Sequence, residues 1–90
     1  MVKVRNMKSN SGRSVANQFE IETDDATYLQ SYDSVIVKKA HNEGRVYLDE
    51  YYWDYSVTTG RYRNMFLGEN KGVTQMKIDS GEYILTNLNK

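Results

Sequence analysis

One segment of the chain concentrates the residue types that bind other molecules. Residues 51–63 contain five of the eleven aromatic residues and two arginines. Exposed tyrosine, tryptophan and arginine dominate the energetic hot spots of protein interfaces. The same residue types could also stack on the bases of a single-stranded nucleic acid while the arginines contact phosphate. The candidate partner-binding residues in and beside this segment are Tyr51, Tyr52, Arg61, Arg63 and Asn64.

A structural role competes with binding for the largest side chains of this region. A domain of 90 residues has to bury its few large apolar groups, so we expect Trp53, Tyr55 and Phe66 in the core. If the segment is a strand, Tyr51 shares a face with Trp53 and Tyr55. Tyr52 would then point the other way, near the surface. Further tyrosines that could extend an exposed aromatic stripe are Tyr28, Tyr32 and Tyr47.

The sequence contains no recognisable catalytic or metal-binding arrangement. His41, the only histidine, lies in a polar loop with no partner to orient it as a base. Asp49, Glu50 and Asp54 lack the spacing of a calcium loop, and no glycine spacing matches a phosphate-binding loop. The absence of cysteine excludes a thiolate zinc site and a cysteine nucleophile. We therefore expect a protein that is not an enzyme and that has no cofactor and no metal site.

Composition and charge narrow the class of protein further. The chain has 12 basic and 12 acidic residues, and this zero net charge argues against a protein that mainly grips phosphate backbones. Its 39% of hydrophobic residues suffices for one modest core. No apolar run approaches the roughly 20 residues of a membrane span, and the N-terminus has no secretory signal. We expect a small soluble cytoplasmic protein with no membrane partner.

The neutral total hides blocks of alternating charge. Residues 1–16 carry four bases and no acid, and residues 17–33 carry five acids and no base. Such blocks are typical of antiparallel strands whose charges pair across a sheet. They would also suit a bipolar surface that binds a partner with complementary patches. The bases of the first block, which are the candidate nucleic-acid contacts, are Lys3, Arg5, Lys8 and Arg13.

In the first half of the chain, apolar and polar residues alternate as they do in strands. With a two-residue turn at Asp24 and Asp25, Ile21 would face Tyr28 and Phe19 would face Gln30. The segments with strand patterns are residues 18–23, 26–31, 34–39 and 45–49. Together they predict a β-meander.

The second half changes to helical spacing. Thr58 is the expected N-cap of a helix that Gly68 ends, and Arg61 and Asn64 share its polar face. A second short helix is expected after Thr74, followed by a strand over residues 82–87.

These elements predict one α+β domain over residues 17–90. Its sheet would be a mainly antiparallel β-meander, with two short helices on one face and a C-terminal strand. Residues 1–16, which are basic and rich in asparagine, serine and glycine, are expected to form a mobile N-terminal arm.

Several segments resemble small uncharacterised proteins that bacteriophages and prophages encode. The most specific are residues 17–19 (Asn-Gln-Phe) and residues 53–59 (Trp-Asp-Tyr-Ser-Val-Thr-Thr), and the similarity extends over residues 9–89. The resemblance implies origin and setting only: a short phage accessory protein that works in the cytoplasm of the bacterial host. It supplies no activity and no catalytic residues.

We therefore expect a non-enzymatic phage accessory protein that binds a host bacterial protein. Inhibition of a defence system such as CRISPR is the most specific form of this expectation. One alternative is a nucleic-acid-binding accessory domain that uses the basic arm and the tyrosine–arginine face. Another alternative is a structural or self-assembling phage component. The oligomeric state, including a homodimer, stays open.

Overall fold

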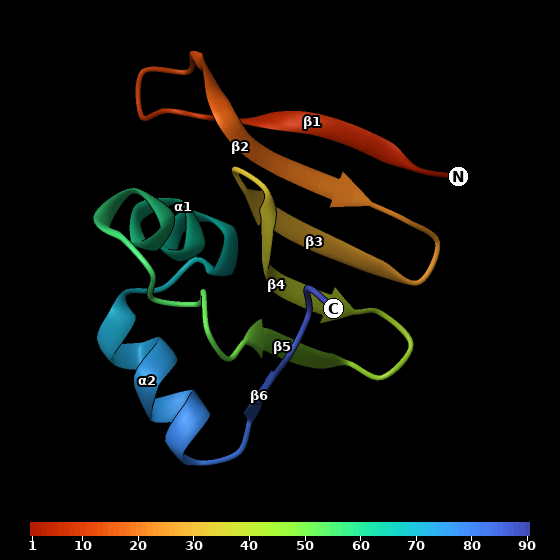
Figure 1. Ribbon diagram of the computed structural model, residues 1–90, viewed down its shortest axis with the longest axis vertical. Helices are drawn as coiled ribbons and strands as arrows, with labels where there is room; N and C mark the ends of the chain where they lie inside the picture. The colour runs from red at the N-terminus through yellow and green to blue at the C-terminus, as the bar shows by residue number, and fades with distance from the viewer.

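Five consecutive strands form the first half of the chain. In the computed structural model, which describes residues 1–90, each strand pairs antiparallel with the next (Figure 1). The predicted β-meander is thereby confirmed. The strands are β1 (Lys3–Lys8), β2 (Ser14–Glu22), β3 (Ala26–Ser31), β4 (Ser34–Ala40) and β5 (Arg45–Asp49).

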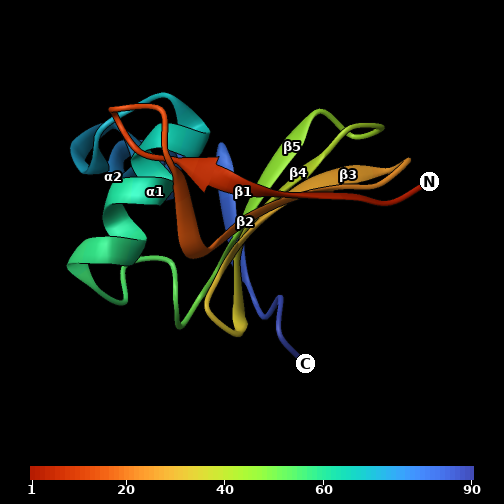
Figure 2. The same ribbon diagram turned by 90° about the horizontal axis from the view of Figure 1, so that it is seen from above.

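Two helices and a last strand complete the domain. They are α1 (Val57–Leu67), α2 (Lys71–Asp79) and β6 (Tyr83–Thr86). Strand β6 lies beside β5 and runs parallel to it, which gives one six-stranded sheet in the order β1-β2-β3-β4-β5-β6. Both helices lie on one side of the sheet (Figure 2). The predicted single α+β domain with two helices and a C-terminal strand is confirmed.

The register of β2 and β3 also agrees with the sequence pattern. Ile21 lies opposite Tyr28, and Phe19 lies opposite Gln30. The backbone N–H of Thr23 donates a hydrogen bond of 2.8 Å to the carbonyl oxygen of Ala26 and closes the predicted turn at residues 24–25. The alternation of apolar and polar residues therefore predicted correctly which side chains share a face of β2 and β3 and which residues pair.

The N-terminal segment, which we expected to be a mobile arm over residues 1–16, contains strand β1 and the start of β2. Strand β1 is an edge strand with mostly exposed side chains, and for that reason it lacks a clear apolar alternation. Arg5 lies opposite Glu20, and its guanidinium reaches Glu20 at 3.4 Å and Glu22 at 3.3 Å. Basic and acidic blocks thus pair across the sheet here.

The segment between β5 and α1 is a series of turns and not the strand suggested by its alternating aromatic residues. Asp49 ends β5, and its Oδ2 accepts hydrogen bonds from the backbone N–H groups of Tyr51 (3.1 Å) and Tyr52 (2.8 Å). Its Oδ1 accepts from the N–H of Leu88 over 2.8 Å. Aspartate hydrogen bonds of this kind compete with strand pairing and bend the chain.

Both helices begin before their predicted caps. The side chains of Ser56 and Asn70 each accept a hydrogen bond from the backbone N–H three residues later, over 3.1 and 2.9 Å. Thr58 and Thr74, which the sequence suggested as caps, lie inside the helices. Gly68 ends α1 as predicted, in the left-handed conformation with φ 70°.

The core lies between the sheet and the helices. The predicted burial of Phe66 is confirmed, and Trp53 is half-buried and packs against the core. Tyr55 is 63% exposed, so its expected burial is wrong, because the turns after β5 direct it outward. The buried apolar cluster consists of Leu29, Ile36, Val37, Leu48, Phe66 and Tyr83.

Candidate partner-binding site

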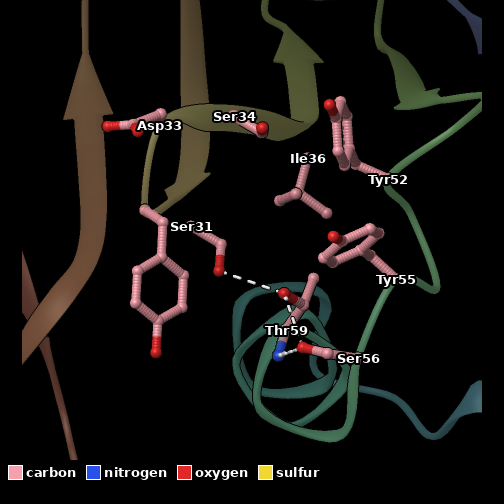
Figure 3. A pocket seen from close by; sticks show the side chains of 9 residues that line it. Ser31, Asp33, Ser34, Ile36, Tyr52, Tyr55, Ser56 and Thr59 are labelled. Atoms are coloured by element: carbon pink, nitrogen blue, oxygen red, sulfur yellow. Dashed lines mark hydrogen bonds between the residues drawn. The ribbon is translucent and has the colours of Figure 1, made fainter.

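A hollow of about 330 Å³ opens where the β3–β4 turn approaches the β5–α1 loop (Figure 3). Its wall combines three tyrosines, four serine or threonine hydroxyl groups, one isoleucine and one carboxylate. This volume is at the lower end of the range of roughly 300–1,000 Å³ for ligand pockets and fits one or two side chains. We call it the tyrosine pocket, and its residues are Ser31, Tyr32, Asp33, Ser34, Ile36, Tyr52, Tyr55, Ser56 and Thr59.

Hydroxyl groups fix the floor of the tyrosine pocket. Oγ of Ser31 and Oγ1 of Thr59 are 3.1 Å apart and join β3 to α1. Ser56 donates from its own Oγ to the same Thr59 oxygen over 3.2 Å. Figure 3 shows these hydrogen bonds at one side of the hollow below Ile36, with Tyr52 and Tyr55 on one flank and Asp33 on the other. The two walls of the pocket are therefore held at a fixed separation.

Beside the pocket, three tyrosines of the β5–α1 loop stack on one another. The rings of Tyr51 and Tyr52 meet nearly at right angles, at 83°, with centroids 4.7 Å apart. The centroids of Tyr52 and Tyr55 are 5.2 Å apart. Edge-to-face contacts of this kind stabilise pairs of aromatic rings. Tyr51 is nevertheless 71% exposed, so this group, the tyrosine cluster (Tyr51, Tyr52 and Tyr55), is a preorganised aromatic surface open to solvent.

Tyr32 occupies a strained position in the β3–β4 turn. Its φ is 55°, in the left-handed region, which costs a residue other than glycine roughly 1–2 kcal/mol. Its N–H donates to the carbonyl of Asn17 over 2.7 Å, and its carbonyl accepts from Nε2 of Gln30 over 2.8 Å. Strained backbone is concentrated at functional sites. Here it presents an exposed tyrosine ring at the pocket.

Asp33 gives the pocket its charge. Apart from the tyrosines, Asp33 is the only lining residue with an ionisable side chain, and this side chain is exposed. A carboxylate at the rim of a pocket attracts a cation or a hydrogen-bond donor of a partner. The pocket is therefore suited to a positively charged or donating group with an apolar stem.

Arg63 was predicted as an exposed contact residue, and this is wrong because its side chain is only 1% exposed. The guanidinium turns inward and donates from Nη1 to the carbonyl of Trp53 (2.7 Å) and to Oδ1 of Asp54 (3.3 Å). Nη2 donates to Oδ1 of Asn64 over 2.9 Å. Arg63, whose guanidinium also bonds to Asn64, therefore holds the loop that carries the tyrosine cluster.

Asp54 extends this support to the second helix. Its Oδ2 is 2.6 Å from Nζ of Lys71, at the start of α2. Burial alone would raise the pKa of Asp54, but hydrogen bonds and charge from Lys71 and Arg63 outweigh it and lower that pKa. The carboxylate is thus ionised at neutral pH and connects the loop with both helices.

Arg61 is the exposed arginine of the predicted set. It lines a shallow polar depression together with Asn64 and Lys71. Ser56 lines both this depression and the tyrosine pocket, so the two hollows adjoin. The structure thus brings Tyr51 and Tyr52 together at one site and places Arg61 next to it.

The four basic residues predicted to contact nucleic acid lie elsewhere. They are exposed on β1 and the turn that follows it, and none lines the tyrosine pocket. The salt bridges to Glu20 and Glu22 compensate part of their charge. These residues are Lys3, Arg5, Lys8 and Arg13.

The lining of the tyrosine pocket offers one carboxylate together with phenol and aliphatic hydroxyl groups. No histidine, lysine or cysteine lines it, and His41 instead bonds through Nε2 to Oγ1 of Thr27 over 2.7 Å. No three acidic or histidine side chains gather closely enough to hold a metal ion. Neither helix has the length and apolar character needed to cross a membrane.

Most residues that the β3–β4 turn contributes to this site were not predicted from the sequence. Asp33 and Ser34 were not singled out, and Tyr32 was only a weak member of an aromatic stripe. A usable signal was present, because a two-residue hairpin turn favours asparagine or glycine where φ is positive. Tyr32 at such a position is unusual and could have drawn attention to the turn.

Comparison with known proteins gives a family but no activity. The model of the family of unknown function DUF8033 matches residues 2–82, a range that includes the whole tyrosine pocket and the tyrosine cluster. No curated protein matches the chain, and no solved structure matches it. The chain belongs to DUF8033, a family of unknown function.

Proposed function

We propose that this protein is a non-enzymatic binding protein whose partner docks on the tyrosine cluster and inserts a side chain into the tyrosine pocket. The observation that carries the proposal is the exposure of Tyr51 (71%) and Tyr55 (63%) in a stacked group beside a hollow. Rigid exposed tyrosines supply a large contact area at a small cost in side-chain entropy.

The chemistry of the pocket points to a lysine or arginine side chain of the partner. Asp33 offers a carboxylate, and Tyr52 and Tyr55 offer aromatic rings that attract a cation. Since no basic residue lines the pocket, nothing in it repels a positive group. The charged end of the partner's side chain would pair with the exposed Asp33 at the rim, and its aliphatic stem would contact the rings.

The source of the partner follows from the resemblance to phage-encoded proteins. That resemblance supports a phage accessory protein that acts in the bacterial cytoplasm on a protein of the host. Components of a defence system such as CRISPR are the first class of host protein to test. A nucleic-acid partner is a weaker proposal, because Glu20 and Glu22 compensate part of the basic charge of β1.

The test is a tagged pull-down from nuclease-treated bacterial lysate, with bound proteins identified by mass spectrometry. The wild type is compared with Tyr51→Ala/Tyr55→Ala and with Met76→Ala, a control at an exposed apolar residue of α2. We expect one stoichiometric protein with the wild type and the control, and its loss with the double variant. Equal recovery by all three proteins, or recovery only from a parallel lysate without nuclease, would contradict the proposal.

A further inference from the structure

A continuous, mainly apolar row crosses all six strands of the sheet. The register places each member directly opposite the next, from one edge of the sheet to the other. Five of the six side chains are aliphatic or aromatic, and the sixth is a lysine. The members of this row, which we call the cross-strand row, are Val4, Ile21, Tyr28, Lys38, Tyr47 and Ile84.

The cross-strand row lies on the face of the sheet turned away from the helices. Leu29, Val37 and Leu48 each neighbour a member of the row in sequence, and all three are buried in the core beneath the helices. Successive side chains of a strand point to opposite faces, so the row points away from the core. Figure 2 shows both helices on one side of the sheet and no helix on the other.

No member of the row is fully buried. Val4 is 60% exposed, and the side chains of Ile21, Tyr28, Tyr47 and Ile84 are all partly exposed. Apolar side chains that stay partly accessible to water across a whole sheet mark a candidate interaction surface. The face therefore suits an occupant that is mainly apolar and that places no cation opposite Lys38.

We propose that the occupant is a second copy of this chain, packed face to face about a twofold axis parallel to the strands. Such an axis reverses the order of the row in the second copy. Val4 then meets Ile84, Ile21 meets Tyr47, and Tyr28 meets Lys38.

The charge of Lys38 selects this axis over one perpendicular to the strands. The perpendicular axis would stack Lys38 on Lys38, and like charges in direct opposition repel. The parallel axis places the ammonium over the ring of Tyr28 in the other copy. Lys38 already makes such a contact within its own chain, with Nζ 5.7 Å from the ring centroid of Tyr47.

The area of the face indicates a weak dimer. Six strands about 4.8 Å apart span about 24 Å, and six residues along a strand span about 20 Å, so the flat area is about 500 Å². Stable complexes bury about 800 Å² per partner. We therefore expect a dissociation constant in the micromolar range.

The dimer would leave the tyrosine pocket free. The pocket is lined by Thr59 of α1 and by Ser31, whose Oγ contacts Thr59, so it opens on the helix side of the sheet. Each dimer would present two such pockets. Two linked sites bind a partner that offers two copies of the target with higher avidity.

The test is the molar mass in solution, measured by sedimentation velocity from about 1 to about 500 μM. We expect the wild type to shift from 10.5 kDa toward twice that mass as concentration rises. Val4→Glu and Ile84→Lys should each weaken association at least about tenfold, whereas Val57→Glu, an exposed control on α1, should not.

A mixture of the two weakened variants tests the axis itself. In the proposed arrangement the new Glu side chain at position 4 of one copy meets the new Lys side chain at position 84 of the other. The mixture should therefore associate within about threefold of the wild-type affinity. Circular dichroism of each variant establishes that it is folded. A wild type that stays at 10.5 kDa throughout, a dimer unaffected by both single changes, or a mixture that does not associate would overturn the proposal.

Discussion

The guanidinium of Arg63 donates a hydrogen bond to the carbonyl oxygen of Trp53 over 2.7 Å. The same guanidinium lies over the indole ring of Trp53, with 5.3 Å between Cζ and the ring centroid. Arg63 belongs to α1, whereas Trp53 belongs to the loop that carries the tyrosine cluster. The contact between Arg63 and Trp53 therefore fixes the loop on α1 and with it the position of the exposed tyrosines.

Removal of the Arg63 side chain should destabilise the whole domain. Arg63→Ala leaves the carbonyl of Trp53 without its donor and Asp54 without one of its two cations. We expect a loss of about 2–4 kcal/mol in the free energy of unfolding, measured by urea titration of tryptophan fluorescence.

Arg61→Ala is the matched control, since it removes the same side chain two residues earlier in α1 at an exposed site. Its effect should stay within about 0.5 kcal/mol. Equal stability of the two variants would show that the buried contacts of Arg63 contribute nothing.

A substitution at Gln18 should stabilise the domain, in contrast to the substitution at Arg63. The Gln18 side chain on β2 is fully buried, and neither Oε1 nor Nε2 has a hydrogen-bond partner. A buried polar group without a partner costs about 1–3 kcal/mol. Methionine is similar in shape to glutamine and has no polar group that needs a partner. We therefore expect Gln18→Met to raise the free energy of unfolding by about 1–2 kcal/mol. Thermal unfolding measures the change, and a lower midpoint would mean that the amide is satisfied in solution.

Asp49 should make the stability of the fold sensitive to acid. Burial alone would raise the pKa of Asp49, but hydrogen bonds from the backbone N–H groups of Leu88, Tyr52 and Tyr51 outweigh it, and the pKa is lowered. The ionised form is thus favoured in the folded state. Its stabilisation is complete above the unfolded pKa of about 3.9 and is lost as pH falls through the lower, folded value.

The measurement compares the free energy of unfolding of the wild type and Asp49→Asn from neutral pH to about pH 2.5. The variant should be less stable at neutral pH and should lose less stability on acidification. Parallel pH profiles for the two proteins would refute the role assigned to this carboxylate.

Elements whose pattern lies within adjacent residues were predicted correctly from the sequence, and elements that depend on distant residues were not. The pairing of Ile21 with Tyr28 followed from alternation and a short turn, both of which are contained in adjacent residues. Strand β1 was missed because its stability comes from pairing with β2 and from Arg5 contacts to Glu20, about fifteen residues away.

The site was only partly predictable for the same physical reason. The aromatic segment was recognisable from its composition, and Tyr51 and Tyr52 do lie at the site. The burial of Arg63 depends on where the carbonyl of Trp53 lies after the loop has turned, and one-dimensional spacing contains no such information. The approach of Asp33 to the loop likewise depends on the packing of β3 and β4 against α1.

If a partner contacts the tyrosine cluster, site-specific photocrosslinking will capture it there. A benzophenone amino acid replaces Tyr55 in one protein and Met76, exposed on α2, in another. Both proteins are irradiated in nuclease-treated bacterial lysate, with and without excess unlabelled wild type. We predict one discrete crosslinked protein from position 55 that the competitor removes, and none from position 76. Crosslinks of equal yield at both positions, or none at position 55, would contradict the assignment of this surface.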